Sequence, residues 1–232
     1  MNGEPDLARI ARALAEPARA VMVLAVLDGQ QHPVGELAGA AGVAPATATD
    51  HVRELADAGI VAIEPRGRQR LVALSGADVA RAIEALTEIA PAKPVRGLAG
   101  AERNTALRTA RTCYDHPAGA LGVALTARLV DDGIVDELEP GTIGNLVQTE
   151  HPTLDYLGVN TSPAGRRPAV RSCLDWTERR PHVAGALGCA ILDALVEGKW
   201  VTRRRDTRAL RVTPSGAERL GELLGDWTPA EA

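Results

Sequence analysis

The stretch GELAGAAGVAPATATDHVRELADAGIV, residues 35–61, decides the fold of the first half of the chain. Apolar residues recur at helical spacing over 34–41 and again over 45–58. Between these two segments, Gly42 and Val43 make a tight turn, and Gly59 ends the second helix. The pattern therefore predicts two short helices that pack against each other across a turn.

A β-hairpin follows these two helices. Strand-forming residues over 60–63 and 70–74 flank the loop PRGRQ at 65–69. Further helical patterns lie before and after this core, at 6–14, 18–27 and 76–90. The order helix, turn, helix and hairpin predicts a winged helix-turn-helix domain over 1–91. For the whole chain we expect a mainly α fold with small β-hairpins, of the α+β type.

The second helix of such a pair lies in the major groove of DNA, which admits one α-helix. The positions expected to face the DNA on this helix are Ala46, Thr47, Thr49, Asp50, His51 and Arg53. Arg66, Arg68, Gln69 and Arg70 at the hairpin should contact phosphates. Asp50 can accept a hydrogen bond from a cytosine amino group, or it can pair with a neighbouring arginine.

These segments resemble the ArsR family of bacterial repressors. ALAEPARAVMVLAVLDG at 13–29 is similar to the opening helix of that family, residues 35–61 to its helix-turn-helix, and RGRQRLVAL at 66–74 to its wing. The resemblance implies a homodimer formed by the first and last helices of the domain, a palindromic operator in double-stranded DNA, and release when an effector binds. Ala44 departs from the pattern, because a hydroxyl cap is usual there.

The resemblance does not by itself imply a metal sensor. Metal-sensing members carry cysteine pairs on the helix before the recognition helix, or histidine and acidic residues on the last helix. Here Val34–Ala41 has no cysteine, and the last helix offers Asp78 but no histidine.

The second half carries an internal repeat after a Pro- and Gly-containing segment, 92–102, that we expect to be a linker. HPAGALG at 116–122 matches HVAGALG at 182–188, and residues 116–135 and 182–201 share 10 identities in 20 positions. We expect two related helix-plus-hairpin units within 103–232, at about 113–167 and 173–220, packed around their Ala- and Gly-rich helices. This extension resembles longer members of the family with an RTCYDH segment.

An effector site, if the chain has one, should lie in this half. Cys113 and His116 would share a face of a helix, and Cys173 and His182 are their counterparts. Three interpretations stay open: the four converge on one zinc ion, the thiols sense oxidants with Arg111 and His116 lowering a cysteine pKa, or they are core residues. The wider set of sensor candidates adds Tyr114, Asp115, Asp175, Trp176, Arg180 and Trp200.

Two other features of this half have alternative explanations. The scarce aromatic residues Tyr114, Trp176 and Trp200 can line a pocket for a small organic effector or simply pack in the core. A second basic cluster contains Arg203, Arg204, Arg205, Arg208 and Arg211. Its hairpin can contact flanking DNA, bind an anion, or form a solvated face.

Composition narrows the class of protein. Hydrophobic residues make up 45% of the 232 residues, with no Phe, which favours a globular chain with close-packed helices. The net charge is −4, and residues 1–91 carry 8 Lys/Arg against 12 Asp/Glu, so DNA contacts must come from local basic positions. Three cysteines without framework spacing, and no apolar run of about 20 residues, lead us to expect a cytoplasmic protein that does not enter the membrane.

An enzyme is the least favoured class. Cys113 and His116 form the one nucleophile–base pair in the sequence that we single out, and no orienting group or phosphate-binding glycine loop accompanies them. A winged helix that binds a protein partner, without an effector, is the alternative to a DNA-binding regulator.

Overall fold

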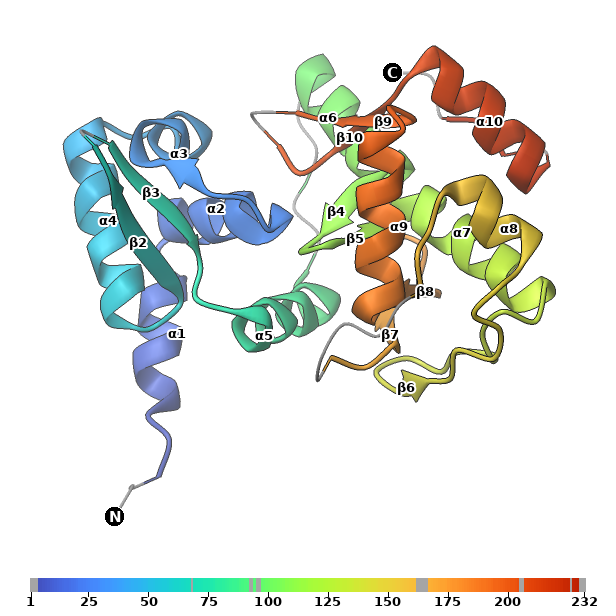
Figure 1. Ribbon diagram of the computed structural model, residues 1–232. Helices are drawn as coiled ribbons and strands as arrows, with labels where there is room; N and C mark the ends of the chain where they lie inside the picture. Colours follow the sequence, from blue (N-terminus) through green and yellow to red (C-terminus); the bar gives the residue numbers. More distant parts are fainter. Residues whose placement is uncertain are drawn as a thin grey trace. The chain divides into compact units, whose positions relative to one another are not determined.

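The computed structural model describes residues 4–67, 69–91, 94, 97–161, 167–204, 207–225 and 227–229. The chain divides into two compact units, which we call the N-terminal unit (residues 1–85) and the C-terminal unit (residues 86–232). Both combine helices with small antiparallel sheets, so the predicted fold class is confirmed (Figure 1). Within the described residues, no helix has both the length and the apolar character needed to cross a membrane.

The N-terminal unit is a winged helix-turn-helix, as predicted. Its elements are α1 (Leu7–Ala15), α2 (Pro17–Ala25), the 3-10 helix η1 (Val26–Asp28), β1 (His32–Pro33), α3 (Val34–Ala41), α4 (Pro45–Asp57), β2 (Val61–Arg66), β3 (Gln69–Leu74) and α5 (Ala77–Ile89), which continues past the end of the unit. Local signals set these bounds. Asp6 caps α1 by accepting from the Arg9 N–H at 3.0 Å, and Gly42 ends α3 with a φ of 67°.

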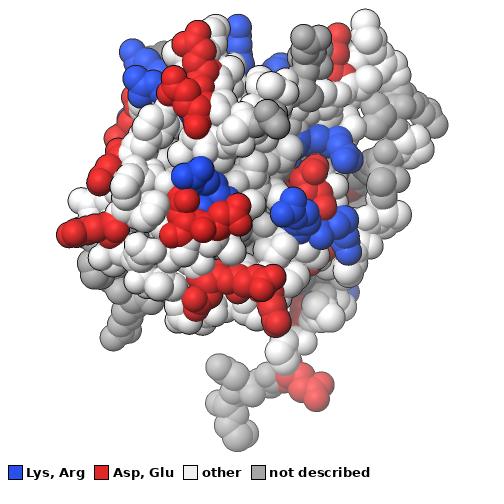
Figure 2. Space-filling view, turned by 90° about the vertical axis from the view of Figure 1, so that its right-hand side faces the viewer, with Lys and Arg blue, Asp and Glu red and all other residues white. Residues whose placement is uncertain are grey.

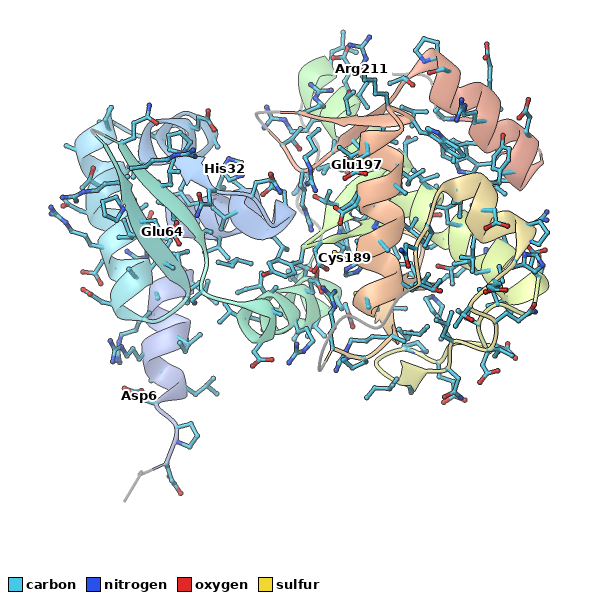
Figure 3. The ribbon with its side chains drawn as sticks, viewed as in Figure 1. Asp6, His32, Glu64, Cys189, Glu197 and Arg211 are labelled. Atoms are coloured by element: carbon cyan, nitrogen blue, oxygen red, sulfur yellow. The ribbon has the colours of Figure 1, made fainter. Side chains whose placement is uncertain are left out.

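The sheet of this unit has the order β1-β3-β2. The two-residue strand β1 was not predicted. His32 pairs with Val72, and its imidazole Nε2 lies 3.0 Å from the Asp28 carboxylate (His32 is labelled in Figure 3). The apolar faces of α2, α3, α4 and β3 meet in one core that includes Met22, Leu37, Val52 and Val72. This core holds α4 by one face and leaves the opposite face exposed.

The C-terminal unit contains the internal repeat. Its elements are α6 (Gly97–Thr109), β4 (Arg111–Cys113), β5 (His116–Ala118), α7 (Gly119–Asp131), β6 (Ile143–Gly144), α8 (Pro152–Leu157), β7 (Val170–Leu174), β8 (Pro181–Ala184), α9 (Gly185–Glu197), β9 (Val201–Arg203), β10 (Leu210–Val212) and α10 (Pro214–Leu224). The predicted linker 92–102 is wrong in part, because residues 97–102 form the start of α6. Residues 92, 93, 95 and 96 lie outside the described residues.

The repeated element is a hairpin followed directly by a helix. We call β4, β5 and α7 the first repeat and β7, β8 and α9 the second repeat. The helices cross between repeats: α7 packs against β8, and α9 packs against β5 (Figure 1). The hydrophobic core of the unit is continuous across both repeats and includes Leu121, Leu125, Leu187 and Ile191.

Candidate functional site

Helix α4 presents polar residues on its exposed face. Ala46, Thr47, Asp50 and Arg53 are exposed, and Thr49 and His51 are half-buried. Ala48, Val52 and Leu55 are buried and attach the helix to the core. The Thr49 hydroxyl donates to the Pro45 carbonyl at 2.9 Å, so its proton is used within the helix. As the sequence indicated, Ala44 provides no side-chain cap.

Asp50 pairs with an arginine of its own helix. The Arg53 Nη1 atom lies 3.2 Å from Asp50 Oδ1, and the side chains are 58% and 72% exposed. Pairs this exposed contribute about 0–1 kcal/mol, so the interaction costs little to break. Arg53 can therefore exchange the carboxylate for a phosphate or a guanine edge.

The loop at the tip of the wing is shorter than predicted, and the two strands are longer. The expected loop at 65–69 is wrong in extent, since Pro65 pairs with Arg70 and Arg66 pairs with Gln69 in the β2–β3 ladder. The chain reverses at Gly67, whose φ is 61°. Arg66, Gln69 and Arg70 are exposed, while Arg68 lies outside the described residues. The hairpin thus holds at least two arginine side chains in solvent next to its tip.

The cysteines and histidines of the repeats meet in the C-terminal unit. The spacing predicted that Cys113 and His116 share a face of a helix, and this prediction is wrong. They are directly opposite partners in the β4–β5 hairpin, which turns through Tyr114 at a φ of 58°. Cys173 and His182 are likewise opposite partners in the β7–β8 hairpin. Side chains at opposite positions of an antiparallel pair lie on the same face, so each hairpin presents one thiol and one imidazole together.

Cys113, His116, Cys173 and His182 form one group, which we call the Cys/His cluster. One sulfur or nitrogen atom from each residue lies within 4.8 Å of those of the other three. The two Sγ atoms are 3.9 Å apart, and the His116 and His182 Nε2 atoms are 3.2 Å apart. Cys113, His116 and His182 are buried, and Cys173 is half-buried.

Glycines explain how the two repeats approach so closely. A Cβ atom on Gly122 of α7 would lie 2.4 Å from the Pro117 carbonyl oxygen and 3.6 Å from the His182 Cβ. A Cβ atom on Gly188 of α9 would lie 2.5 Å from the Val183 oxygen and 3.0 Å from the His116 Cβ. The last glycine of each repeated motif therefore lets a helix pack against the histidine of the other repeat.

A buried carboxylate stands behind His182. Asp175 accepts from Arg111 Nη2 at 2.8 Å and from the Gly119 N–H at 2.7 Å, and both side chains of the Arg111–Asp175 ion pair are fully buried. Burial alone would raise the pKa of Asp175, but the charge of Arg111 holds it below its ordinary range. Asp175 Oδ2 is also 3.6 Å from His182 Nδ1. Burial and the neighbouring His116 lower the pKa of His182 well below its usual value, so this imidazole is neutral.

Asp115 occupies the equivalent place behind His116. Its Oδ1 atom lies 3.4 Å from His116 Nδ1, and Arg167 binds both carboxylate oxygens at 2.5 and 2.9 Å. Burial raises the pKa of Asp115, but the hydrogen bonds from His116 and Arg167 lower it to about 2. Each histidine of the cluster thus has an ionised carboxylate behind its Nδ1 atom.

The other predicted sensor residues lie outside the cluster. Trp176 stacks on the Arg111 guanidinium at 4.7 Å, and Arg180 is exposed. Trp200 is 3% exposed and makes an edge-on contact with Tyr156, which is 41% exposed. Trp176 is half-buried, whereas Trp200 belongs to the core. Arg111, one of the two residues expected to lower a cysteine pKa, forms a buried ion pair with Asp175.

The second basic cluster is not a freely projecting wing. Its hairpin, β9–β10, returns toward β4: the Thr112 N–H donates to the Arg208 carbonyl at 2.9 Å, and Ala209 forms a β-bridge with Arg111. Arg208 is 9% exposed, and Arg205 lies outside the described residues. Figure 2 shows acidic and basic side chains interspersed over one face of the molecule. Arg211 and Glu197 are labelled in Figure 3.

Sequence reasoning did not identify Arg167. It did predict close packing of the Ala- and Gly-rich helices, and the structure adds that Gly122 and Gly188 each approach the histidine of the other repeat. The signal for the glycines was present, because both close the repeated AGALG motif. Arg167 precedes the second repeat and has no sequence pattern that links it to Asp115, 52 residues earlier.

An exposed helix α4 beside an arginine-bearing hairpin defines the N-terminal unit as a DNA-binding domain of the winged helix-turn-helix class. Residues 14–64 match the family described as a helix-turn-helix domain. Over 216 residues the chain is 39% identical to the uncharacterized HTH-type transcriptional regulator YdfF of Bacillus subtilis (strain 168), covering 91% of this chain and 94% of that protein. The chain therefore belongs to the HTH-type transcriptional regulators, and the predicted helix-turn-helix regulator is confirmed.

Other relatives match the first part of the chain. The HTH-type transcriptional regulator CmtR of Mycobacterium tuberculosis (strain ATCC 25618 / H37Rv) is 37% identical over 86 residues, 37% of this chain and 72% of that protein. A solved homodimeric winged helix-turn-helix domain from Mycobacterium bovis, described as a possible ArsR-family regulator, is 28% identical with a TM-score of 0.32. It covers 37% of this chain and 86% of that one.

Proposed function

We propose that the chain is a homodimeric, sequence-specific repressor that binds a palindromic operator and is released by an effector sensed in its C-terminal unit. The observation that carries the DNA-binding part is the exposed face of α4 next to the exposed Arg66 and Arg70 of the wing. The effector is a metal ion, a thiol oxidant or a small molecule.

The charge distribution favours specific over nonspecific binding. The region that carries α4 and the wing is acidic, with 8 Lys/Arg against 12 Asp/Glu in residues 1–91. Nonspecific affinity rests on phosphate neutralisation, so it should be weak here. Arg53, Arg66 and Arg70 place the available positive charge where a winged helix meets DNA. Base contacts from α4 then have to supply most of the discrimination.

Exposed apolar residues support dimer formation. Leu7 on α1 is 75% exposed, and Leu86 and Ile89 on α5 are 45% and 80% exposed. Large apolar side chains in solvent are typical of surfaces that a second chain covers. A two-fold dimer places its two recognition helices in successive major grooves, about 34–36 Å apart, which is why a palindrome is expected.

The C-terminal unit supports sensing rather than catalysis. Cys113 and His116 form the proposed nucleophile–base pair, but they are 3% and 4% exposed, so a substrate has no direct access to the thiol. The same two residues belong to a group shared by both repeats. A chemical change in that group would alter how the repeats pack, which is a physical route from an effector to a conformational change.

Selection of bound fragments from random duplex DNA tests the proposal. The full chain, reduced and at about physiological salt, should enrich a palindrome with half-sites about one helical turn apart. A chain with Thr47→Ala and Arg53→Ala should lose this enrichment while its unfolding transition stays unchanged. If neither the reduced nor the oxidised protein enriches any sequence, the chain is instead a partner-binding winged-helix module.

A further inference from the structure

We infer that Cys113, His116, Cys173 and His182 bind one tetrahedral zinc-class metal ion, which joins the first repeat to the second. The inference concerns the C-terminal unit alone and does not depend on the proposed function. The ligand atoms are the two Sγ atoms and the two Nε2 atoms, which lie together in a buried group.

The spacing of these atoms fits one ion. With bond lengths of about 2.3 Å to sulfur and about 2.0–2.1 Å to nitrogen, a tetrahedral zinc site has its sulfurs about 3.8 Å apart and its nitrogens about 3.3–3.4 Å apart. The observed separations are 3.9 Å for Sγ–Sγ and 3.2 Å for Nε2–Nε2. These two edges agree with a tetrahedral site, and the four edges that join a sulfur to a nitrogen are no longer than 4.8 Å, so the group would contract slightly around a bound ion.

The two hairpins contribute equivalent pairs of ligands. Each hairpin contributes one cysteine and one histidine from directly opposite positions, Cys113 with His116 and Cys173 with His182. The pairs come together because Gly122 and Gly188 let each helix approach the histidine of the other repeat. Two Cys–His pairs related by a repeat complete the four-ligand set of a closed site.

The carboxylates behind the histidines favour metal binding. A histidine that binds a metal through Nε2 carries its proton on Nδ1, commonly facing a carboxylate. His116 Nδ1 faces Asp115 at 3.4 Å, and His182 Nδ1 faces Asp175 at 3.6 Å and has no hydrogen-bond partner. Without an ion, the two Nε2 atoms at 3.2 Å need a proton between them. An ion bound to both Nε2 atoms needs no proton between them and leaves an Nδ1–H on each histidine to face its carboxylate.

The donor set selects the class of ion. Two thiolates and two imidazoles in tetrahedral geometry suit zinc(II) and related soft or borderline ions, and disfavour magnesium and calcium, which take oxygen ligands. Two thiolates also balance the two positive charges of the ion, so the buried group would be neutral as a whole. All four positions are filled by the protein, which is the pattern of closed sites that stabilise a fold.

Cobalt(II) substitution of the full chain tests the site. We expect the purified protein to hold about one zinc ion per chain. The ion-free protein should bind one equivalent of cobalt(II), with intense visible absorption typical of tetrahedral coordination and thiolate-to-cobalt charge transfer. X-ray absorption on the zinc form should give two sulfur neighbours at about 2.3 Å and two nitrogen neighbours at about 2.0–2.1 Å. No bound metal, or a pale octahedral cobalt spectrum without sulfur, would overturn the inference.

Variants assign the ligands. Cys113→Ser and Cys173→Ser should each lose thiolate-to-cobalt absorption, whereas Cys189→Ser should keep the wild-type spectrum. Cys189 lies on α9 outside the cluster, with its sulfur 3.7 Å from Asp193 (labelled in Figure 3). Asp115→Asn keeps all four ligands and should weaken metal binding about 10–100-fold. If a cysteine variant does not fold, X-ray absorption on the wild-type chain still shows whether two sulfur and two nitrogen atoms bind the ion. A wild-type spectrum from folded Cys113→Ser would exclude the assignment.

Discussion

The Nε2 atoms of His116 and His182 lie 3.2 Å apart, although the residues are 66 positions apart in the chain. They hold the same place in two repeats, at the start of HPAGALG and HVAGALG. The meeting of equivalent residues means that the two repeats face each other at this point. A change at the cluster therefore acts on both halves of the C-terminal unit.

The wing should contribute sequence-independent affinity. Arg66→Ala or Arg70→Ala should weaken binding to all DNA and reduce the slope of log affinity against log salt by about 1 each, because each removes one phosphate contact. Anisotropy titrations at several salt concentrations measure both quantities. Arg103→Ala, an exposed charge on α6, is the matched control and should leave the slope unchanged. Equal slopes in all the variants would place the wing away from DNA.

We expect Arg53 to contribute to sequence-specific recognition of the operator. Its pair with Asp50 is exposed and weak, so the guanidinium is available to a base edge. Arg53→Ala should cost about 1–3 kcal/mol on the selected operator and relax preference at one position of each half-site. Competition between operators with single base changes measures this effect. Glu54→Ala, at an exposed neighbouring position of α4, should keep the wild-type preference. A uniform loss on every sequence would instead make Arg53 a phosphate contact.

The glycines that close the repeated motif should be intolerant of a methyl group. Gly122→Ala would place Cβ 2.4 Å from a backbone oxygen, so we expect a loss of about 1–3 kcal/mol in the unfolding free energy of the C-terminal unit. Gly221→Ala in α10 meets no atom within 4 Å and should stabilise by about 0.5–1 kcal/mol. Urea unfolding compares the two variants. Similar effects would show that α7 does not pack as closely as described.

The buried ion pair should be far more sensitive than an exposed one. Arg111→Met leaves the Asp175 carboxylate uncompensated at 0% exposure and should cost about 3–5 kcal/mol. Arg128→Met breaks the Arg128–Asp132 pair on the partly exposed end of α7 and should cost about 0–1 kcal/mol. Thermal or urea unfolding of both variants provides the comparison. A small effect at Arg111 would mean that Asp175 takes up a proton when the guanidinium is removed.

His32 should make the stability of the N-terminal unit depend on pH. The hydrogen bond to Asp28 raises the pKa of His32 despite its burial, with help from Glu36. A histidine with a raised folded-state pKa stabilises fully below its unfolded pKa of about 6.5, and this contribution disappears as pH rises through the folded value. His32→Gln should therefore lose more stability at about pH 5.5 than at about pH 8.5. An equal loss at both values would show that the charge of His32 plays no part.

Much of the N-terminal unit follows from local sequence signals. The periodicity over 34–41 and 45–58, the turn at Gly42 and the stop at Gly59 predict α3 and α4 closely, because each signal acts within a few residues. Strand β1 is not predicted, because two residues are too few to show the alternation typical of a strand. The strands of the wing extend further than predicted, because Pro65 is a residue type typical of loops but pairs with Arg70 here.

In the C-terminal unit, local sequence signals do not predict the geometry of the Cys/His cluster. A spacing of three residues suits one turn of a helix, but it also suits opposite positions around a two-residue hairpin turn, and Cys113–His116 is the second case. Tyr114 adopts the positive φ of that turn without being the glycine or asparagine that would predict it. The repeat did predict that Cys113, His116, Cys173 and His182 correspond. Their meeting depends on long-range packing that spacing does not encode.

The most direct test of the account is the operator affinity of the full chain with the Cys/His cluster in different states. We would measure Kd on the selected operator for the metal-bound, metal-free and thiol-oxidised protein, each checked for folding. If the C-terminal unit controls DNA binding, Kd should change about 5–150-fold between at least two states. Equal affinity in all three states would contradict the proposal that a chemical change in the cluster is the route from an effector to DNA release.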